Sequence, residues 1–592
     1  MIAPGTVLLD DNLSPGGESL FFADPVEIVE TRRAEDVPAA LSRLEQAGSE
    51  GYWAAGFLAY ELGLALEDRL LPRMPRGLVT PLLWFGLYRE PARFDAPGLR
   101  RFAEAGEEAS IAGLTPSLDR AAYQRKFTEA KRLIAAGDIY QVNLTFKARF
   151  RLKGDPLGLY RQLMSSQKVA FGALVATGGQ TILSRSPELF VRNTGGELSM
   201  RPMKGTALRG PTGTSDEAER QALQGDAKNR AENLMIVDML RNDLGRIAEM
   251  GSVAVTDLYS VESFRSLHQM TSGIEARLRP GTGLAEIFRA LFPSGSVTGA
   301  PKIRAMEIIS EIENEPRGVY TGAIGCISPK GDFRFNVAIR TVVIGAGGEG
   351  EIGIGGGIVA DSTVEAEYDE AVLKMKFLAQ PAKDFSLIET LLWERGKGFA
   401  LAERHFSRLA NSAAYAGFPL APGAAGAALQ TAALSFAEPR QRVRLLLDAD
   451  GTISVSATAL PPGAPKEVSF ILAQARVDSA DWRLYHKTTL RDFLDAPRQA
   501  ANEEGVDEVV FRNERGEVTE GSYMTLFIRR DGVLLTPALI SGLLPGTLRA
   551  ELLARGEAQE AVLHVHDLES ADEIFLGNSV RGLQRARFLR EG

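Results

Sequence analysis

The stretch VAIRTVVI, residues 337–344, is almost wholly apolar and rich in branched side chains, and it holds one charged residue, Arg340. The stretches VAFGALVAT (169–177) and AIGCIS (323–328) have the same character and are bounded by glycine turns. Long helical patterns such as AAYQRKFTEAKRLIAAG (121–137) lie between them. This mixture predicts antiparallel sheets with helices packed outside, and it places Arg340 within an apolar strand.

The length of the chain predicts more than one domain. Its 592 residues exceed the size at which a single core stops growing, so two or three cores are expected. The helical pattern EAVLKMKFL ends in AQPAKD (379–384), where a proline interrupts it, and a new unit begins at Phe385. We therefore predict an N-terminal part (1–110) and a catalytic domain (111–380) of one unit, followed by a second unit (381–592).

The composition is that of an ordinary soluble globular protein, with 45% hydrophobic and 24% charged residues. A formal net charge of -9 argues against nucleic acid or an anionic membrane as a partner. The amino terminus lacks the basic start and apolar core of a signal peptide, and we expect a cytoplasmic protein. The single cysteine, Cys326, lies in AIGCIS and predicts a buried apolar role.

Three carboxylates stand in otherwise apolar helical stretches: Glu232 in AENLMIVDMLRNDLG (231–245), and Glu367 and Glu370 in AEYDE (366–370). Taken singly, each is expected to be a surface glutamate of an amphipathic helix. A buried carboxylate is costly unless it is paired or bound to a metal. Since Mg²⁺ prefers one or two carboxylates with water and an anionic substrate, the three together predict a Mg²⁺ site.

Long motifs surround these carboxylates in a fixed order: IAAGDIYQVNLT (134–145), SRSPELF (184–190), RPMKGT (201–206), PSGSVTGAPKIRAMEII (293–309), RGVYTGAIG (317–325), FNVAIRT (335–341) and GGGIVADS (355–362). In these motifs the first two thirds of the chain resembles the chorismate-using enzymes, and within them aminodeoxychorismate synthase component I. The resemblance implies a layered α+β fold with one large chorismate domain.

The resemblance also assigns the groups that bind substrate. Chorismate carries two carboxylates and an allylic hydroxyl, so its site needs cations, N–H donors and a metal ion. Arg340 and Lys374 would supply the cations, although Lys374 lies one helical turn after Glu370 and a structural ion pair is the alternative. The remaining implied contacts are the glycine loop and two hydroxyls: Gly355, Gly356, Gly357, Thr298 and Tyr320.

Lys204 of RPMKGT distinguishes members of the resembling family. In the synthases that make the para isomer this lysine attacks the ring before ammonia adds, whereas anthranilate synthases usually have alanine there. Gln141 stands where isochorismate synthases carry a lysine that activates water, so ammonia is the expected nucleophile. The usual catalytic histidine aligns with Gln269, which leaves the neighbouring His268 as the candidate general acid.

The final third carries a second set of motifs: ERHFSRLANSA (403–413), HKTTLRDFLDAPRQA (486–500), EVTEGSYMTLFI (517–528), ISGLLPGTLRAELL (540–553) and FLGNSVRGL (575–583). They resemble the fold-type IV pyridoxal-phosphate enzymes, including aminodeoxychorismate lyase and the branched-chain and D-amino acid aminotransferases. The resemblance implies an α/β unit of two subdomains that can form a homodimer.

In this second family Lys487 would carry pyridoxal 5'-phosphate, and Glu520 would keep its ring nitrogen protonated. The phosphate would lie at the helix start formed by GLLPGTLR. The residues implied around the phosphate are Gly546, Thr547, Leu548, Asn578, Ser579 and Arg408.

Together the two halves imply synthesis of 4-amino-4-deoxychorismate and elimination of pyruvate from it to give 4-aminobenzoate, a folate precursor. A synthase fused to an aminotransferase of another substrate is the alternative, and a regulatory protein that only binds chorismate is a third reading. The ammonia is expected from a separate glutamine amidotransferase subunit, because Cys326 lies in no motif typical of a glutaminase nucleophile.

Overall fold

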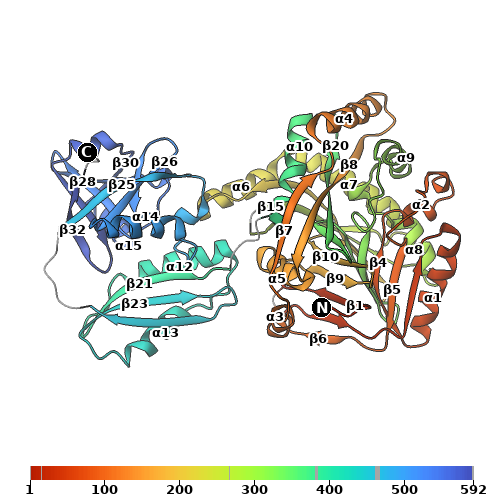
Figure 1. The fold of residues 1–592 in the computed structure, drawn as a ribbon, viewed down its shortest axis with the longest axis horizontal. Helices are drawn as coiled ribbons and strands as arrows, with labels where there is room; N and C mark the ends of the chain where they lie inside the picture. Colours follow the sequence, from red (N-terminus) through yellow and green to blue (C-terminus); the bar gives the residue numbers. More distant parts are fainter. Residues whose placement is uncertain (1, 15, 266, 380–383, 461–466, 590–592) are drawn as a thin grey trace. The chain divides into compact units, whose positions relative to one another are not determined.

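The computed structural model describes residues 2–14, 16–265, 267–379, 384–460 and 467–589 (Figure 1). The chain forms two compact units, one of residues 1–207 and 222–382 and the other of residues 208–221 and 383–592. The boundary predicted at residues 380–381 falls outside the described residues. No helix of the described part of the chain is both long and apolar enough to cross a bilayer.

The first unit contains two sheets. The first runs in the order β16 (Gly299–Ala300), β8 (Gln141–Gly154), β20 (Glu349–Ile358), β19 (Thr341–Gly345), β10 (Gln180–Ser186), β9 (Phe171–Ala176), β1 (Thr6–Asp10), β2 (Ser19–Phe22) and β6 (Ala92–Phe94), with β7 (Ala109–Pro116) paired to β8. The second runs in the order β13 (Met203–Leu208), β15 (Leu267–Arg277), β12 (Glu197–Arg201), β11 (Leu189–Thr194), β18 (Phe333–Val337), β17 (Ala323–Ile327), β4 (Trp53–Leu58), β5 (Leu83–Tyr88) and β3 (Glu27–Thr31), with β14 (Ala254–Ser263) paired to β15.

The stretch VAIRTVVI does not form a single strand, so the prediction for Arg340 was wrong. Its first residue ends β18 in the second sheet, and its last four belong to β19 in the first sheet. Arg340 lies between them with a φ of 50°, in the left-handed region that a continuous strand cannot contain. The apolar pattern failed to reveal the break because both strands are buried.

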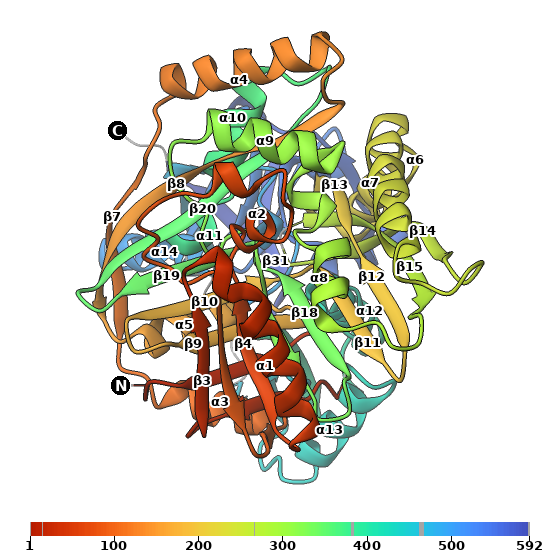
Figure 2. The same cartoon turned by 90° about the vertical axis from the view of Figure 1, so that its right-hand side faces the viewer.

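Helices cover the outer faces of the two sheets, which pack against each other. Val7 of β1 and Val175 of β9 share a buried cluster with Phe57 of β4 and Trp84 of β5. Figure 2 shows helices outside the sheets, among them α1 and α4. The helices that pack on the sheets are α1 (Val37–Ser49), α4 (Arg120–Ala135), α5 (Pro156–Ser166), α7 (Ala227–Gly245), α8 (Leu284–Leu291), α9 (Lys302–Ile312) and α10 (Val364–Leu373). The prediction of layered antiparallel sheets with helices outside is confirmed.

The second unit also has two sheets. The smaller contains β22 (Gly398–Phe399), β21 (Leu387–Glu394), β23 (Arg440–Leu447) and β24 (Ile453–Ala459), and the larger β27 (Val518–Gly521), β26 (Glu508–Asn513), β25 (Val468–Val477), β32 (Gly582–Phe588), β31 (Glu573–Asn578), β28 (Thr525–Arg530), β29 (Val533–Pro537) and β30 (Gln559–Ala561). Helices α12 (Ala402–Ala416) and α13 (Ala424–Ala433) contact the smaller sheet, and α14 (Asp492–Glu503) and α15 (Thr547–Ala554) contact the larger.

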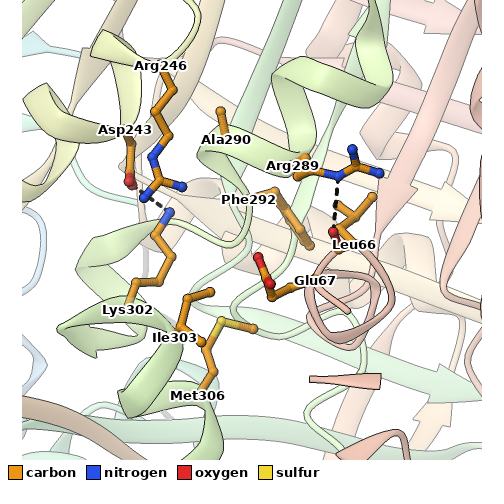
Figure 3. A pocket seen from close by; sticks show the side chains of 11 residues that line it. Leu66, Glu67, Asp243, Arg246, Arg289, Ala290, Phe292, Lys302, Ile303 and Met306 are labelled. Carbon is orange, nitrogen blue, oxygen red and sulfur yellow. Dashed lines mark hydrogen bonds and ion pairs between the residues drawn. The ribbon is translucent and has the colours of Figure 1, made fainter. Parts of the chain in front are cut away.

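A small pocket lies beside the C-terminal end of α7, as Figure 3 shows, with about 30 Å³ of space. Lys302 Nζ lies 2.5 Å from a carboxylate oxygen of Asp243, and Arg289 Nε donates to the Leu66 carbonyl at 3.2 Å. This volume holds roughly one water molecule. None of the predicted site residues lines it, so we assign it a structural role.

A buried ion pair joins β1 to β10 inside the first unit. Arg185 Nη1 donates to both carboxylate oxygens of Asp10 at 2.8 Å, and both side chains are 0% exposed. The Tyr160 hydroxyl also donates to Asp10, and Arg185 Nη2 donates to Asn12 Oδ1 at 2.7 Å. Since each buried charge has its partners, the group stabilises the sheet only while it is complete.

We predict that Asp10→Ala destabilises the first unit by about 3–5 kcal/mol, because it leaves Arg185 as a buried unpaired cation. Glu18→Ala, which removes the exposed ion pair with Arg93, is the matched control and should cost at most about 1 kcal/mol. Hydrogen exchange of β1, β9 and β10 amides measures the effect separately from the second unit. Equal protection in the two variants would contradict the role of the buried pair.

Candidate functional sites

Strand β20 carries the glycine run of the first site. Gly355, Gly356 and Gly357 pair with β8, and a Cβ at Gly355 would lie 2.3 Å from the Leu144 carbonyl oxygen. A Cβ at Gly357 would lie 2.8 Å from Lys204 Nζ and 3.0 Å from Gln141 Nε2. A side chain at Gly357 would fill the space beside the lysine, so the strand can present bare backbone to a ligand there.

Lys204 lies on β13 and contacts the N-terminal part of α7. Its Nζ is 3.1 Å from Glu232 Oε2, and the side chains are 20% and 17% exposed. Asp226 caps α7 by accepting the Asn229 N–H, which sets the start of the helix that carries Glu232. The structure therefore brings together two predicted residues from separate motifs and leaves both partly open to a ligand.

Helix α10 supplies the other two carboxylates. Lys374 Nζ lies 2.8 Å from Glu370 Oε1 and donates to the Gly355 carbonyl at 2.8 Å. Burial raises the pKa of Glu367, although the Ser362 hydroxyl donates to it at 2.6 Å. Burial also acts to raise the pKa of Glu370, but the Lys374 cation outweighs it and lowers the value. The structural ion pair that was the alternative for Lys374 is present together with a contact to the glycine strand.

The three carboxylates do not form a closed metal cage. Among the described residues no group of three His, Cys, Asp or Glu side chains is close enough to share an ion. Glu367 and Glu370 interact electrostatically with each other and with Lys204, and Glu232 pairs with the same lysine. This donor set suits a cation that takes one or two carboxylates and completes its shell with water and substrate.

Arg340 is a half-buried residue whose guanidinium has a buried donor, Nη1, to spare. Within the described part of the chain its Nη1 has no hydrogen-bond partner, and burial lowers its pKa to about 10. A buried charge without a partner is costly. The site is therefore suited to an anionic ligand such as a carboxylate, and the left-handed crossing between the sheets is what holds the guanidinium there.

The predicted hydroxyl contacts differ in their geometry. Thr298 is fully buried, and its Oγ1 contacts the carbonyls of Ser294 and Gly295 at 3.1 and 3.3 Å. Its proton is committed to the backbone, so a ligand could use only its lone pairs. The ring of Tyr320 packs at Gly353, where a Cβ would lie 2.0 Å away. Burial raises the pKa of Tyr320, so its hydroxyl stays neutral.

On β15, Gln269 and not His268 contacts the residues that follow Lys204. Gln269 Nε2 donates to the Gly205 carbonyl at 2.9 Å, and its Oε1 accepts from the Thr206 hydroxyl at 3.2 Å. His268 is 0% exposed, and its Nδ1 lies 2.9 Å from Ser263 Oγ. Since neighbouring strand residues point to opposite faces, the prediction of His268 as general acid gains no support from these contacts.

Two residues that the sequence reasoning missed support Lys204. Glu188 is 3% exposed, and burial raises its pKa to about 7, although the Ser296 hydroxyl donates to it at 2.6 Å and the Met203 N–H also bonds to it. Asn233 is fully buried and bridges Ser272 Oγ at 2.6 Å and the Lys204 carbonyl at 3.4 Å. The signal for Glu188 was present, as a carboxylate in the otherwise apolar end of SRSPELF.

The second site surrounds Lys487. Its Nζ donates to Thr390 Oγ1 at 3.1 Å, and burial, aided by the Arg408 charge, lowers its pKa to about 7. Burial also raises the pKa of Glu520 to about 8, although the Leu544 N–H donates to it at 2.7 Å. The buried amine and the buried carboxylate thus both have pKa values close to neutral pH. Such a pair suits a ligand that carries a carbonyl and a basic ring nitrogen.

The predicted phosphate-binding end of this site combines α15 with α12. Gly546 is the N-cap of α15, Thr547 and Leu548 begin the helix, and the Thr547 hydroxyl lies 3.2 Å from His405 Nε2. Ser579 Oγ lies 3.0 Å from the same nitrogen. The free N–H groups of this helix start can receive a phosphate. Asn578 instead accepts the Val580 and Arg581 N–H groups and shapes the turn.

Glu389 and His405 were missed in the sequence. Arg408 donates to both Glu389 oxygens at 2.9 and 2.7 Å and to the Pro545 carbonyl at 3.2 Å. Burial acts to raise the pKa of Glu389, but Arg408 and His405 outweigh it and hold the pKa at about 2. The predicted charge partner of the phosphate is thus already paired, and it lies beside the helix start through Pro545.

Comparison with known proteins identifies the first half. The family of chorismate binding enzymes matches residues 16–380. The chain belongs to the chorismate binding enzymes. The class IV aminotransferase family matches residues 386–588, so the chorismate binding region is followed by a class IV aminotransferase domain.

Two curated relatives and one solved structure are similar to the first unit. Aminodeoxychorismate synthase component 1 of Klebsiella aerogenes is 38% identical over 54% of this chain and 75% of its own length. Anthranilate synthase component 1 of Streptomyces coelicolor is 38% identical over 49% of this chain and 57% of its own length. The crystal structure of anthranilate synthase component I from Streptococcus pneumoniae is 27% identical, with a TM-score of 0.54 over 62% of this chain and 93% of that one. Identity alone therefore does not separate the two reactions.

We predict that the Lys487 amine of the cofactor-free protein titrates with a midpoint of about pH 7, since burial disfavours the charged form. Above that pH the amine is neutral and nucleophilic. NMR of ¹³Cε-labelled lysine follows the titration, and the signal missing from Lys487→Arg identifies the residue. A Lys487 midpoint near the ordinary lysine value of roughly 10.4 would contradict the burial of the amine.

Proposed function

We propose that this chain converts chorismate and ammonia to 4-amino-4-deoxychorismate in its first unit and then eliminates pyruvate in its second, giving 4-aminobenzoate. The observation that carries the proposal is the position of Lys204, which lies against Gly357 and Glu232 within a chorismate binding fold. A lysine at this place supplies a nucleophile for the ring. Aminodeoxychorismate synthases are among its relatives, which agrees with the para product.

In the first step the buried Arg340 guanidinium holds a substrate carboxylate, and the glycine strand admits the ring beside Lys204. Lys204 Nζ forms a bond to the ring carbon as the allylic hydroxyl takes up a proton and leaves as water. Glu188, which bonds to the N–H of Met203 beside Lys204, is the proposed donor of that proton. Ammonia then adds and releases the lysine. Gln141 cannot deprotonate water, so it does not favour the competing hydroxyl transfer.

Glu232 and Glu370 are the residues that would hold Mg²⁺, and Glu367 would contact it through water. When bound, the ion stabilises the charge that develops on the leaving oxygen. Glu232 would exchange Lys204 for the ion, which leaves the amine free to react. Loss of product on chelation and its return with added Mg²⁺ would test this assignment.

The residues of the second site fit pyridoxal phosphate: the start of α15 would hold its phosphate, Glu520 would contact its ring nitrogen, and Lys487 would bind its carbonyl. The cofactor supplies an electron sink for breaking bonds to the carbon that bears the amine. Lys487 would transfer the proton whose movement permits release of pyruvate and aromatisation. His405, held by Glu389, orients the Thr547 and Ser579 hydroxyls at the phosphate end.

An aminotransferase of a different substrate is the second candidate function, because the class IV aminotransferase family matches this unit. The fusion of consecutive steps favours the lyase. Release of pyruvate in equal amount to 4-aminobenzoate separates the two, since a transaminase would not form 4-aminobenzoate from aminodeoxychorismate.

We further propose that a separate glutamine amidotransferase subunit supplies the ammonia. Glutaminases of this kind need an activated cysteine, and burial in β17 raises the pKa of Cys326, the single cysteine of the sequence, to about 11. Product formation with glutamine as the sole nitrogen source, with and without an added glutaminase subunit, tests this partner. Turnover of glutamine by this chain alone would refute it.

Lys204→Ala is expected to lower formation of aminodeoxychorismate by at least ~10²-fold, because it removes the nucleophile and keeps the carboxylate site. Lys228→Ala, an exposed lysine on α7, is the matched control. Mass analysis of the products from chorismate and ammonium measures the loss and detects any change to anthranilate. Normal turnover of Lys204→Ala would exclude covalent catalysis.

Lys487→Ala is expected to stop 4-aminobenzoate formation while aminodeoxychorismate accumulates, because the two sites have separate cores. The variant should also lose the visible absorbance of a lysine-linked cofactor. Lys397→Ala, whose lysine is 77% exposed, serves as control. If wild-type protein takes up no pyridoxal phosphate when it is supplied, the reading of the second site fails.

A further inference from the structure

Residues 208–221 leave the first unit and belong to the second. The chain departs after Ala207 and returns at Ala222, although the chorismate binding family spans this region without interruption. Helix α6 (Gly213–Gly225) begins in the segment. Lys204 precedes the segment by a few residues and Glu232 follows it on the next helix, so it is bounded in sequence by two residues of the first site.

Arg209 anchors this segment within the second unit. Its Nε and Nη2 donate to the two oxygens of Asp216 at 2.5 and 2.6 Å, and Nη2 also donates to the Tyr415 carbonyl at 3.1 Å. The guanidinium carbon lies 4.4 Å from the centre of the Tyr415 ring. The two charged side chains are only 8% and 13% exposed. A shielded bidentate pair with a ring beneath it is a directional contact, unlike an ordinary surface ion pair.

The Tyr415 ring transmits this contact to the residue before Lys487. It stacks on His486 with ring centres 4.2 Å apart and an interplanar angle of 23°. His486 is buried, and its Nδ1 lies 2.9 Å from the Oγ of Ser412, which lies one turn before Tyr415 on α12. The Pro211 backbone also interacts with His486. The imidazole of His486 therefore contacts both Tyr415, the partner of Arg209, and Pro211 of the segment that carries Arg209.

The other side of the Lys487 segment is held by main-chain bonds to the region of β21. The Ile388 N–H donates to the Lys487 carbonyl at 2.7 Å, and the Thr489 N–H donates to the Ser386 carbonyl at 3.0 Å. With β21 on one side and the His486 stack on the other, the direction of the lysine side chain is set from two sides. One of these two supports depends on residues 208–221.

We propose that Arg209 is a positioning residue for Lys487, acting through Tyr415 and His486. The inference rests on the proposed role of Lys487 as the cofactor-bearing lysine. It implies that the second site is incomplete without a segment from the midst of the chorismate binding sequence. A change at Arg209 therefore alters the second site although it lies nearer in sequence to the first.

Full-length variants test the proposal. Arg209→Ala removes the guanidinium. Asp216→Asn keeps the shape of the side chain that pairs with Arg209 but removes its negative charge. Arg209→Lys keeps the charge without the fork and should be intermediate. Arg220→Ala, which lies on α6 like Asp216 and removes an exposed ion pair with Glu217, is the matched control. Two readouts are needed: hydrogen exchange of the Thr489 amide in cofactor-free protein, and the dissociation constant for pyridoxal phosphate.

We expect Arg209→Ala and Asp216→Asn each to accelerate exchange at Thr489 and to weaken pyridoxal phosphate binding, by about tenfold. Arg220→Ala should change neither. Wild-type values for both readouts in Arg209→Ala, or the same change in Arg220→Ala, would overturn the proposal. If wild-type protein itself binds no pyridoxal phosphate, the proposed function fails, while the exchange comparison still decides whether Arg209 orders the Lys487 segment.

Discussion

The crossing of the chain from one sheet to the other at Arg340 is the constraint on which the first site depends. A left-handed residue between β18 and β19 places a guanidinium inside the unit with a donor unused by the described residues. Such a charge is unfavourable in the free protein, and burial lowers its pKa to about 10. An anionic ligand would pair with the guanidinium and remove this cost. The sheet topology, which holds Arg340 in place, therefore favours binding of an anion.

Each of the two proposed sites contains a lysine, but the surroundings of the two lysines differ. Lys204 is partly exposed and paired with Glu232, so its reactivity depends on what displaces that carboxylate. Among the described residues no carboxylate forms an ion pair with Lys487, and burial, aided by nearby arginines, lowers its pKa to about 7. The first lysine is therefore controlled by competition for a carboxylate, and the second by desolvation. This difference agrees with a metal-dependent site followed by a cofactor-dependent one.

Much of the fold and some contacts among the predicted site residues could be predicted from the sequence, because long motifs and helical spacing are local signals. The pairing of Lys374 with Glu370 and the helix start at Thr547 are of this kind. The split at Arg340 was missed because both flanking strands are buried and equally apolar. Asn233 and Glu389 were missed for another reason, since their roles come from partners distant in sequence, Ser272 and Arg408. No local pattern indicates that residues 208–221 belong with the second unit.

The most direct test of the central claim is the fate of one labelled atom. Purified protein is supplied with chorismate, ¹⁵N-ammonium, Mg²⁺ and pyridoxal phosphate, and all products are identified by mass. The account predicts ¹⁵N-labelled 4-aminobenzoate and an equal amount of pyruvate, with labelled aminodeoxychorismate as the intermediate. Labelled anthranilate, or aminodeoxychorismate that persists without any 4-aminobenzoate, would contradict it.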